Sequence, residues 1–236
     1  MSGTSEPKGG PSRERRPAFV CAPLYPILDT AGDARGLLAL LDAVLRARPP
    51  WLQLRWKHAP GGPLLDLAVE VVARAGAVGC RVIVNDRLDV ALASGAAGVH
   101  LGQDDLPLAA ARRVAGDRLV VGVSTHDEAE ARAAEAGGAD YVGFGPMFAT
   151  VSKADALVPR TFDGLRAARA AIRIPIVAIG GITPESAPAV LDAGADAVAM
   201  ISALAAAPDP AALCTRLLAL PRGAGGHERV RNIPRA

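Results

Sequence analysis

Aromatic residues and cysteines are scarce in this chain. Phe, Tyr and Trp make up 3% of its 236 residues, and there are three cysteines, Cys21, Cys80 and Cys214. The cysteines are far apart and form no CxxC or Cys/His spacing, which argues against a zinc site. Their odd number and wide separation predict reduced thiols in a cytoplasmic protein.

Long apolar runs and a strong charge of either sign are also missing. No stretch approaches the roughly 18 apolar residues of a membrane span, and the N-terminus lacks the apolar segment of a signal peptide. The net charge is +2, of which residues 1–20 contribute +2 and residues 221–236 contribute +3. The remaining −3 on residues 21–220 argues against nucleic acid as a partner. Neither nucleic acid nor membrane is therefore expected, whereas a homo-oligomer stays open.

Half of the residues are hydrophobic, and short β-branched runs alternate with Ala- and Leu-rich helical patterns. We count eight such strand–helix units between residues 21 and 220, without an internal linker. Strict alternation of this kind predicts a single (β/α)₈ TIM barrel, with a doubly wound open sheet as the alternative. Residues 1–20 are expected to form a disordered tail and residues 221–236 a flexible one.

Two aspartates follow neighbouring predicted strands. Asp86 comes after Arg81–Val84, and Asp105 comes after Gly98–Leu101. The carboxyl ends of adjacent parallel strands lie side by side, so the two carboxylates should face each other. Such a pair is costly unless a cation or a shared proton separates it, and hard oxygen ligands suit Mg²⁺. The alternative is that each aspartate caps the helix that follows it.

The predicted strand Trp51–Lys57 carries two cations on one face. Strand residues alternate in direction, so Gln53, Arg55 and Lys57 should point into the barrel lumen. Cationic side chains inside a protein need negatively charged partners. They could clamp a phosphate, with Arg55 as a bidentate fork, or they could form internal ion pairs with barrel aspartates.

Further polar groups follow the later strands. Ser124 and His126 follow the fifth strand, although there Ser124 could simply cap a helix and His126 could lie on the surface. The loop after the sixth strand holds Thr150, Ser152 and Lys153, which suits binding but also an ordinary turn.

Two small-residue segments come after the last two predicted strands. Gly180–Thr183 (GGIT) follows the seventh strand, and Ile201–Ala203 (ISA) follows the eighth. Backbone N–H groups in such positions frequently bind a phosphate in barrels. A cationic site near a metal and a backbone anion site together suggest displacement of pyrophosphate with electrostatic stabilisation.

Several segments in order resemble the thiamine-phosphate synthase family. They are QLRWK (Gln53–Lys57), VND (Val84–Asp86), HLGQDD (His100–Asp105), GVS (Gly122–Ser124), the segment from Ala139 to Lys153, IGGIT (Ile179–Thr183) and MIS (Met200–Ser202). The resemblance implies a (β/α)₈ barrel that joins hydroxymethylpyrimidine pyrophosphate to thiazole phosphate. It further implies that pyrophosphate is released, that Mg²⁺ is used, and that the chemistry is dissociative.

The resemblance also implies residue roles. Asp86 and Asp105 would hold Mg²⁺. Gln53 would contact the pyrimidine, and the pyrophosphate would be held by Arg55, Lys57, Asn85, Ser124 and Lys153, most of which would be catalytic. The thiazole phosphate would be held by Thr150, Ser152, Gly181, Ile201 and Ser202.

Two rival functions stay open at this point. One is a metal-free thiazole tautomerase of the same fold, in which His126 would be the acid or base. The other is a catalytically silent paralogue that binds thiazole phosphate without turnover.

Overall fold

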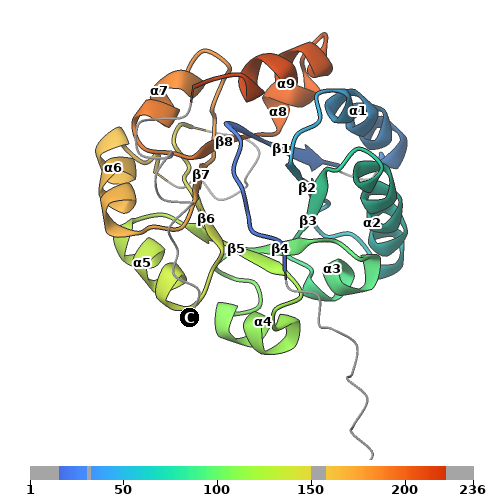
Figure 1. Cartoon of the computed structure of the whole chain (residues 1–236), viewed down its shortest axis with the longest axis horizontal. Coiled ribbons are helices and arrows are strands. Elements are labelled where there is room, and N and C mark those ends of the chain that lie inside the picture. The colour runs from blue at the N-terminus through green and yellow to red at the C-terminus, as the bar shows by residue number, and fades with distance from the viewer. Residues whose placement is uncertain (1–15, 31–32, 150–157, 222–236) are drawn as a thin grey trace, which may run out of the picture.

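The computed structural model describes residues 16–30, 33–149 and 158–221. Eight parallel strands close into a barrel in the order β1 to β8, and helices surround it as a ring (Figure 1). The strands are β1 Leu24–Asp29, β2 Trp51–Arg55, β3 Arg81–Asn85, β4 Gly98–Leu101, β5 Val120–Thr125, β6 Tyr141–Phe144, β7 Ile176–Ala178 and β8 Ala197–Met200. The barrel predicted from the sequence is confirmed, and the open-sheet alternative is wrong because β1 pairs with β8.

Each strand except β8 is followed by one helix, and β8 by two. The helices are α1 Ala34–Arg46, α2 Gly61–Gly76, α3 Leu88–Ser94, α4 Leu108–Ala115, α5 Glu128–Ala136, α6 Phe162–Ala171, α7 Ala187–Asp192, α8 Ser202–Ala205 and α9 Pro210–Leu218. Several begin at a side-chain cap of the expected kind: Asp33, Asp127, Thr161 and Asp209 each accept a hydrogen bond from a backbone N–H three residues on. The short helix α8 begins directly at the ISA segment and is separate from α9.

Strand alternation divides the interior into two apolar layers. In β2, Leu52 and Leu54 join the large core between barrel and helices, whereas Trp51 belongs to the smaller cluster inside the lumen. Gln53, on the same face as Trp51, is 3% exposed and lines the lumen above it. The predicted orientation of this strand is therefore confirmed.

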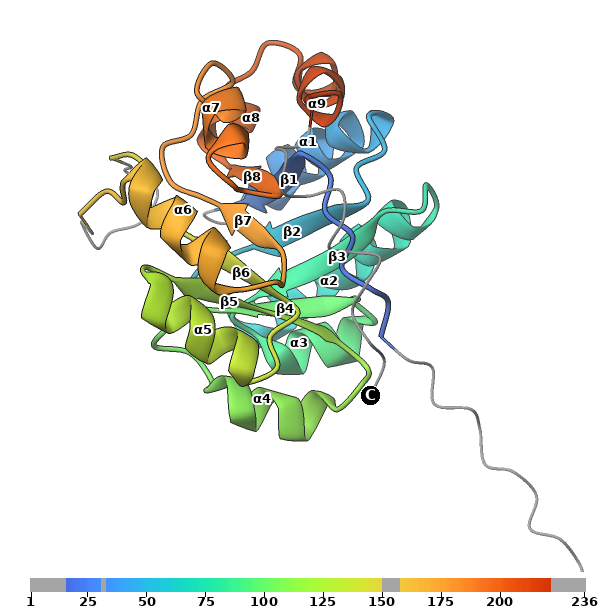
Figure 2. The ribbon, with the colours of Figure 1, turned by 60° about the vertical axis from the view of Figure 1, so that its left-hand side comes forward.

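The segment from Arg16 to Pro23 closes the amino-terminal end of the barrel. Arg16 pairs with Asp117 at 2.6 Å and with Asp140 at 2.9 Å, and Phe19 is only 7% exposed in the lumen cluster. The chain crosses the barrel at this point (Figure 1), and Figure 2 shows the same segment beside the sheet. The prediction that the disordered tail extends to residue 20 is thus wrong for residues 16–20, because a lone ion-paired arginine and one phenylalanine leave no periodic pattern.

No helix in the described part of the chain has both the length and the apolar character needed to cross a bilayer.

Candidate active site

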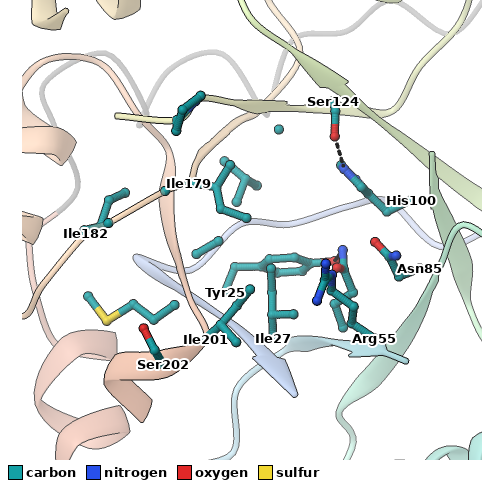
Figure 3. A pocket seen from close by; sticks show the side chains of 18 of the residues that line it. Tyr25, Ile27, Arg55, Asn85, His100, Ser124, Ile179, Ile182, Ile201 and Ser202 are labelled. Carbon is teal, nitrogen blue, oxygen red and sulfur yellow. Dashed lines mark hydrogen bonds between the residues drawn. The ribbon is translucent and has the colours of Figure 1, made fainter. Parts of the chain in front are cut away.

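A pocket opens at the carboxyl ends of the strands, where barrel enzymes carry their chemistry. Nine of the residues singled out in the sequence line it: Gln53, Arg55, Lys57, Asn85, Asp86, Ser124, Gly181, Ile201 and Ser202. In Figure 3, Arg55, Asn85, His100 and Ser124 occupy one side of the pocket, whereas Ile179, Ile182, Ile201 and Ser202 occupy the other. Thr150, Ser152 and Lys153 lie outside the described residues, so their positions stay predictions.

The two cations of the β2 face each have a carboxylate partner. Arg55 forms an ion pair with Asp29 at the end of β1, and Lys57 Nζ lies 2.8 Å from Asp86 Oδ2. The Arg55 side chain is 11% exposed and that of Lys57 is 45% exposed. The ion-pair interpretation of this strand is therefore confirmed. The phosphate clamp stays a prediction, and both cations line the open pocket in which it would act.

Asp86 has two marks of a functional position. Its φ is +64°, a backbone conformation that costs free energy for residues other than glycine and clusters at active sites. Burial raises the pKa of Asp86, Lys57 opposes that rise, and the neighbouring carboxyl of Asp105 adds to it. The expected pair of neighbouring aspartates is present, and Lys57 lies beside it as the third charged member of the cluster.

The second aspartate is fixed by its own loop. Asp105 Oδ2 accepts a hydrogen bond of 2.7 Å from the N–H of Gly102, directly after β4. No group of three or more His, Cys, Asp or Glu side chains gathers anywhere in the described residues. A metal at this edge would thus have two carboxylate ligands and complete its shell with water and phosphate oxygens, which is how Mg²⁺ binds in phosphate-transfer sites. The donor set fits the metal that the sequence implies.

The opposite edge is built from backbone. Gly180 and Gly181 have φ values of +102° and +62°, and a Cβ on Gly181 would lie 2.5 Å from the carbonyl oxygen of Ala149. The N–H groups of Met147 and Phe148 donate to the carbonyls of Ile179 and Gly180 at 2.9 Å. The two glycines therefore let the loop after β6 lie directly on the loop after β7.

The chain does not enter a helix directly after GGIT. Thr183 and Ser186 hydrogen-bond each other through side chain and backbone, and α7 starts only at Ala187. Ser202, by contrast, is the first residue of α8, where the backbone N–H groups of a first turn have no partner within the helix.

The fifth strand ends with two residues that behave differently. Ser124 faces the pocket, and its Oγ lies 3.0 Å from His100 Nε2, whereas the cap of α5 is Asp127. His126 turns away: its Nδ1 lies 2.9 Å from Glu130 Oε2, and it is absent from the pocket lining. The helix-cap interpretation of Ser124 is therefore wrong. His126 lies outside the pocket, but the surface interpretation does not hold for it, because its side chain is only 16% exposed.

Four residues in or beside the pocket escaped the sequence reasoning, namely Tyr25, Asp29, His100 and Tyr141. Both tyrosines of the chain lie on lumen-facing strand positions, and their hydroxyls are 3.1 Å apart. Tyr141 also lies 3.0 Å from His100 Nδ1. A signal was available, because a polar aromatic residue inside a buried strand needs a hydrogen-bond partner.

Comparison with known proteins gives a consistent result. The profile of the family described as thiamine monophosphate synthase matches residues 24–204. The thiamine-phosphate synthases of Moorella thermoacetica and Chloroflexus aurantiacus are each 47% identical, over 82% and 84% of this chain and 93% and 91% of their own. The structure of thiamine phosphate pyrophosphorylase from Pyrococcus furiosus superposes with a TM-score of 0.73 at 34% identity, covering 82% of this chain and 92% of that one.

Proposed function

The chain belongs to the thiamine-phosphate synthase family and is a transferase of thiamine biosynthesis, and from this premise we propose how its pocket carries out the reaction. The pyrimidine pyrophosphate binds along the β2 and β3 edge, and the thiazole phosphate binds along the β7 and β8 edge. The observation that carries the proposal is the cluster at the first edge. There Lys57 lies 2.8 Å from Asp86, and the neighbouring Asp105 carboxyl contributes to the raised pKa of Asp86.

The pyrophosphate end of the substrate needs positive charge that is present before it arrives. Arg55 and Lys57 lie one strand period apart and face the same pocket, so a fork and a point charge converge on one group. Asn85 and Ser124 line the same side and supply neutral donors. Lys153, from the loop after β6, is proposed to complete the set.

Asp86 and Asp105 are proposed to hold Mg²⁺, which when bound neutralises charge on the departing pyrophosphate. Burial is the main reason that the pKa of Asp86 is raised, and the neighbouring Asp105 carboxyl adds to the rise. A divalent cation removes the cost of placing the two carboxylates side by side. Lys57 is then shared between Asp86 and the substrate.

The bond that breaks joins the pyrimidine methylene carbon to the pyrophosphate oxygen. Its electron pair leaves with the pyrophosphate, which the cations stabilise, and the thiazole nitrogen then attacks the pyrimidine methylene cation. The protein supplies no nucleophile in this scheme. Its work is to position two substrates and to stabilise developing negative charge, which is the largest contribution in many enzymes.

Gln53 is proposed to orient the pyrimidine, because its amide is buried on the lumen face below Arg55. The thiazole phosphate is proposed to bind at Gly181, Ile201 and Ser202, where two strand ends and the first turn of α8 meet, together with Thr150 and Ser152. The three cysteines are buried thiols, which supports a cytoplasmic location.

The test is pyrophosphate release by the purified protein, measured with each substrate alone, with both, and with both plus excess chelator. Release that requires both substrates and Mg²⁺ is expected. Binding of thiazole phosphate without release would instead identify the silent paralogue. Isomerisation of the thiazole that is insensitive to the chelator would identify the tautomerase.

A further inference from the structure

A continuous line of hydrogen bonds runs along the floor of the pocket. It passes from Gln53 through Tyr25, Tyr141 and His100 to Ser124, with successive separations of 3.4, 3.1, 3.0 and 3.0 Å. Figure 3 shows its last link, the contact between His100 and Ser124. Both ends of the line reach groups that the proposed function places against substrate, whereas the three middle members carry no role there.

Neighbouring strands leave space for the rings of this line. A Cβ on Gly122 would lie 2.1 Å from the Tyr141 ring, and a Cβ on Gly143 would lie 3.0 Å from His100 Cε1. Glycine in the interior of a strand weakens the sheet, so two of them beside two polar rings indicate that the arrangement is specific. Below, Phe19 stacks on Tyr141 with ring centroids 4.1 Å apart and planes 12° apart.

The chemistry of the donors sets a direction along the line. The Gln53 amide nitrogen can only donate, so Tyr25 accepts there and its own hydrogen is available to Tyr141. Burial raises the pKa of both tyrosines above their usual value, so each keeps one hydrogen to donate. Tyr141, having accepted from Tyr25, then donates to His100 Nδ1.

That direction fixes the imidazole. A histidine that accepts at Nδ1 carries its hydrogen at Nε2, and Nε2 faces Ser124 Oγ at 3.0 Å. Ser124 therefore accepts from His100, and its own O–H points away from the ring. The opposite direction would leave the Tyr25 hydrogen without an acceptor among the described partners in this line.

We propose that His100 is a positioning residue that fixes the Ser124 hydroxyl as a hydrogen-bond donor into the pocket. The inference rests on the proposed function, in which Ser124 contacts the pyrophosphate. A hydroxyl whose orientation is set in advance costs no reorganisation when negative charge develops on the leaving group. The buried line thus converts a group that could donate or accept into one that only donates.

The test uses two substitutions that separate the two nitrogens of the ring. His100→Gln places an amide N–H near the former Nε2 and can still donate to Ser124, whereas His100→Asn reaches only toward Tyr141. We expect kcat to fall about 100-fold in His100→Asn, the effect of losing one oriented donor, and to be largely retained in His100→Gln. His126→Gln serves as the histidine control outside the pocket. Equal losses in the two His100 variants would overturn the proposal.

A double-mutant cycle tests whether His100 acts through Ser124. Ser124→Ala should lower kcat as His100→Asn does, and the double variant should be no slower than Ser124→Ala alone, since residues that act as a unit are not additive. Additive losses would contradict the inference. A wild-type protein that forms no thiamine phosphate would instead overturn the proposed function, so the two failures are distinguishable.

A spectroscopic measurement on the wild-type protein tests the tautomer of His100 without depending on the activity of any variant. The ¹⁵N spectrum of the wild-type imidazoles, four in the whole chain, reports which ring nitrogen carries hydrogen, and the His100 signal is assigned by its loss in His100→Gln. If His100→Gln fails to fold, the His100 signal of the wild-type protein is assigned instead from scalar and dipolar contacts to Tyr141. Hydrogen at Nε2 with Nδ1 unprotonated is expected, and the Nδ1–H tautomer would overturn the proposal.

Discussion

At the amino-terminal end of the barrel, Phe19 and Trp51 pack with their ring centroids 4.9 Å apart. At the carboxyl end of the same strands, Arg55, Lys57 and Asp86 pack charge against charge. One end is closed and buried, and the other is open and polar. Trp51 and Arg55 are the first and last of the five residues of β2, so the barrel divides stability from chemistry along the length of a single strand.

The division has a physical reason. Aromatic burial at the closed end contributes hydrophobic free energy and needs no partner outside the protein. The open end holds the carboxylates of Asp86 and Asp105 side by side, and Asp86 also has a strained backbone. Both features cost stability until a ligand compensates for them. Substitutions at the two ends should therefore affect different measurements.

The largest effect is expected at the open end, in Asp105→Asn. The side-chain oxygen that accepts from Gly102 is kept, but the negative charge is lost, so the fold should persist while Mg²⁺ binding fails. We expect kcat/KM to fall about 100- to 1000-fold, measured as pyrophosphate release against Mg²⁺ concentration. The neighbouring Asp104→Asn, at an exposed position, is the matched control. Unchanged activity in Asp105→Asn would exclude it as a metal ligand.

At the closed end, Phe19→Ala should destabilise the protein by about 3 kcal/mol, as large-to-small aromatic changes in cores do. Phe19 is 7% exposed and contacts Tyr25, Trp51 and Tyr141. The midpoint of thermal unfolding should fall by roughly 6–12 °C for a chain of this size. Val20→Ala, at a side chain that is 41% exposed, should change it little. If Phe19→Ala also lowered kcat at a temperature at which the variant is fully folded, the separation between the two ends would be wrong.

A smaller effect is expected from paired glycine substitutions. Gly181→Ala and Gly95→Ala impose a similar backbone cost, since φ is +62° and +74°, and through the backbone alone each should lose about 1 kcal/mol of stability. Only at Gly181 would the new Cβ also collide, with Ala149 and Phe148. KM for thiazole phosphate should therefore rise in Gly181→Ala and stay constant in Gly95→Ala. Equal KM values in both variants would remove the β7 edge from the thiazole site.

The sequence predicted the repeated parts of the molecule better than the single ones. Eight strand–helix units and the alternation of β2 follow from periodicity, which many residues express together. The segment from Arg16 to Val20 has no period, so its place in the barrel was missed.

The site divides in the same way. Asp86 and Asp105 were paired correctly because strand ends meet at one edge, a rule that needs only topology. Ion pairs of Arg55 and Lys57 with barrel aspartates were one of the two alternatives, but the particular partners, Asp29 and Asp86, depend on rotamers and on which carboxylate lies nearest. The line through Tyr25, Tyr141 and His100 was also missed, since three separate strands contribute one member each.

The smallest effect concerns the buried thiols. Burial raises the pKa of Cys80 to about 12 and that of Cys214 to about 11. At pH 8 the thiolate fraction of Cys80 is then on the order of 10⁻⁴, so alkylation should be about 1000-fold slower than in the unfolded chain. Alkylation of the folded protein, followed by mass spectrometry, should leave all three cysteines unmodified and kcat unchanged.

The same measurement distinguishes the two ends when it is repeated on Phe19→Ala. Cys21 lies in the lumen cluster with Phe19, whereas Cys214 is buried on α9 outside the barrel. Loss of the Phe19 ring should increase the solvent exposure of the Cys21 thiol and leave that of Cys214 unchanged. Cys21 should thus become reactive first, at an alkylation rate that Cys214 does not share. Equal rates at the two cysteines would mean that the variant opens by global unfolding, and that Arg16 to Pro23 does not act as a separate closure of the barrel.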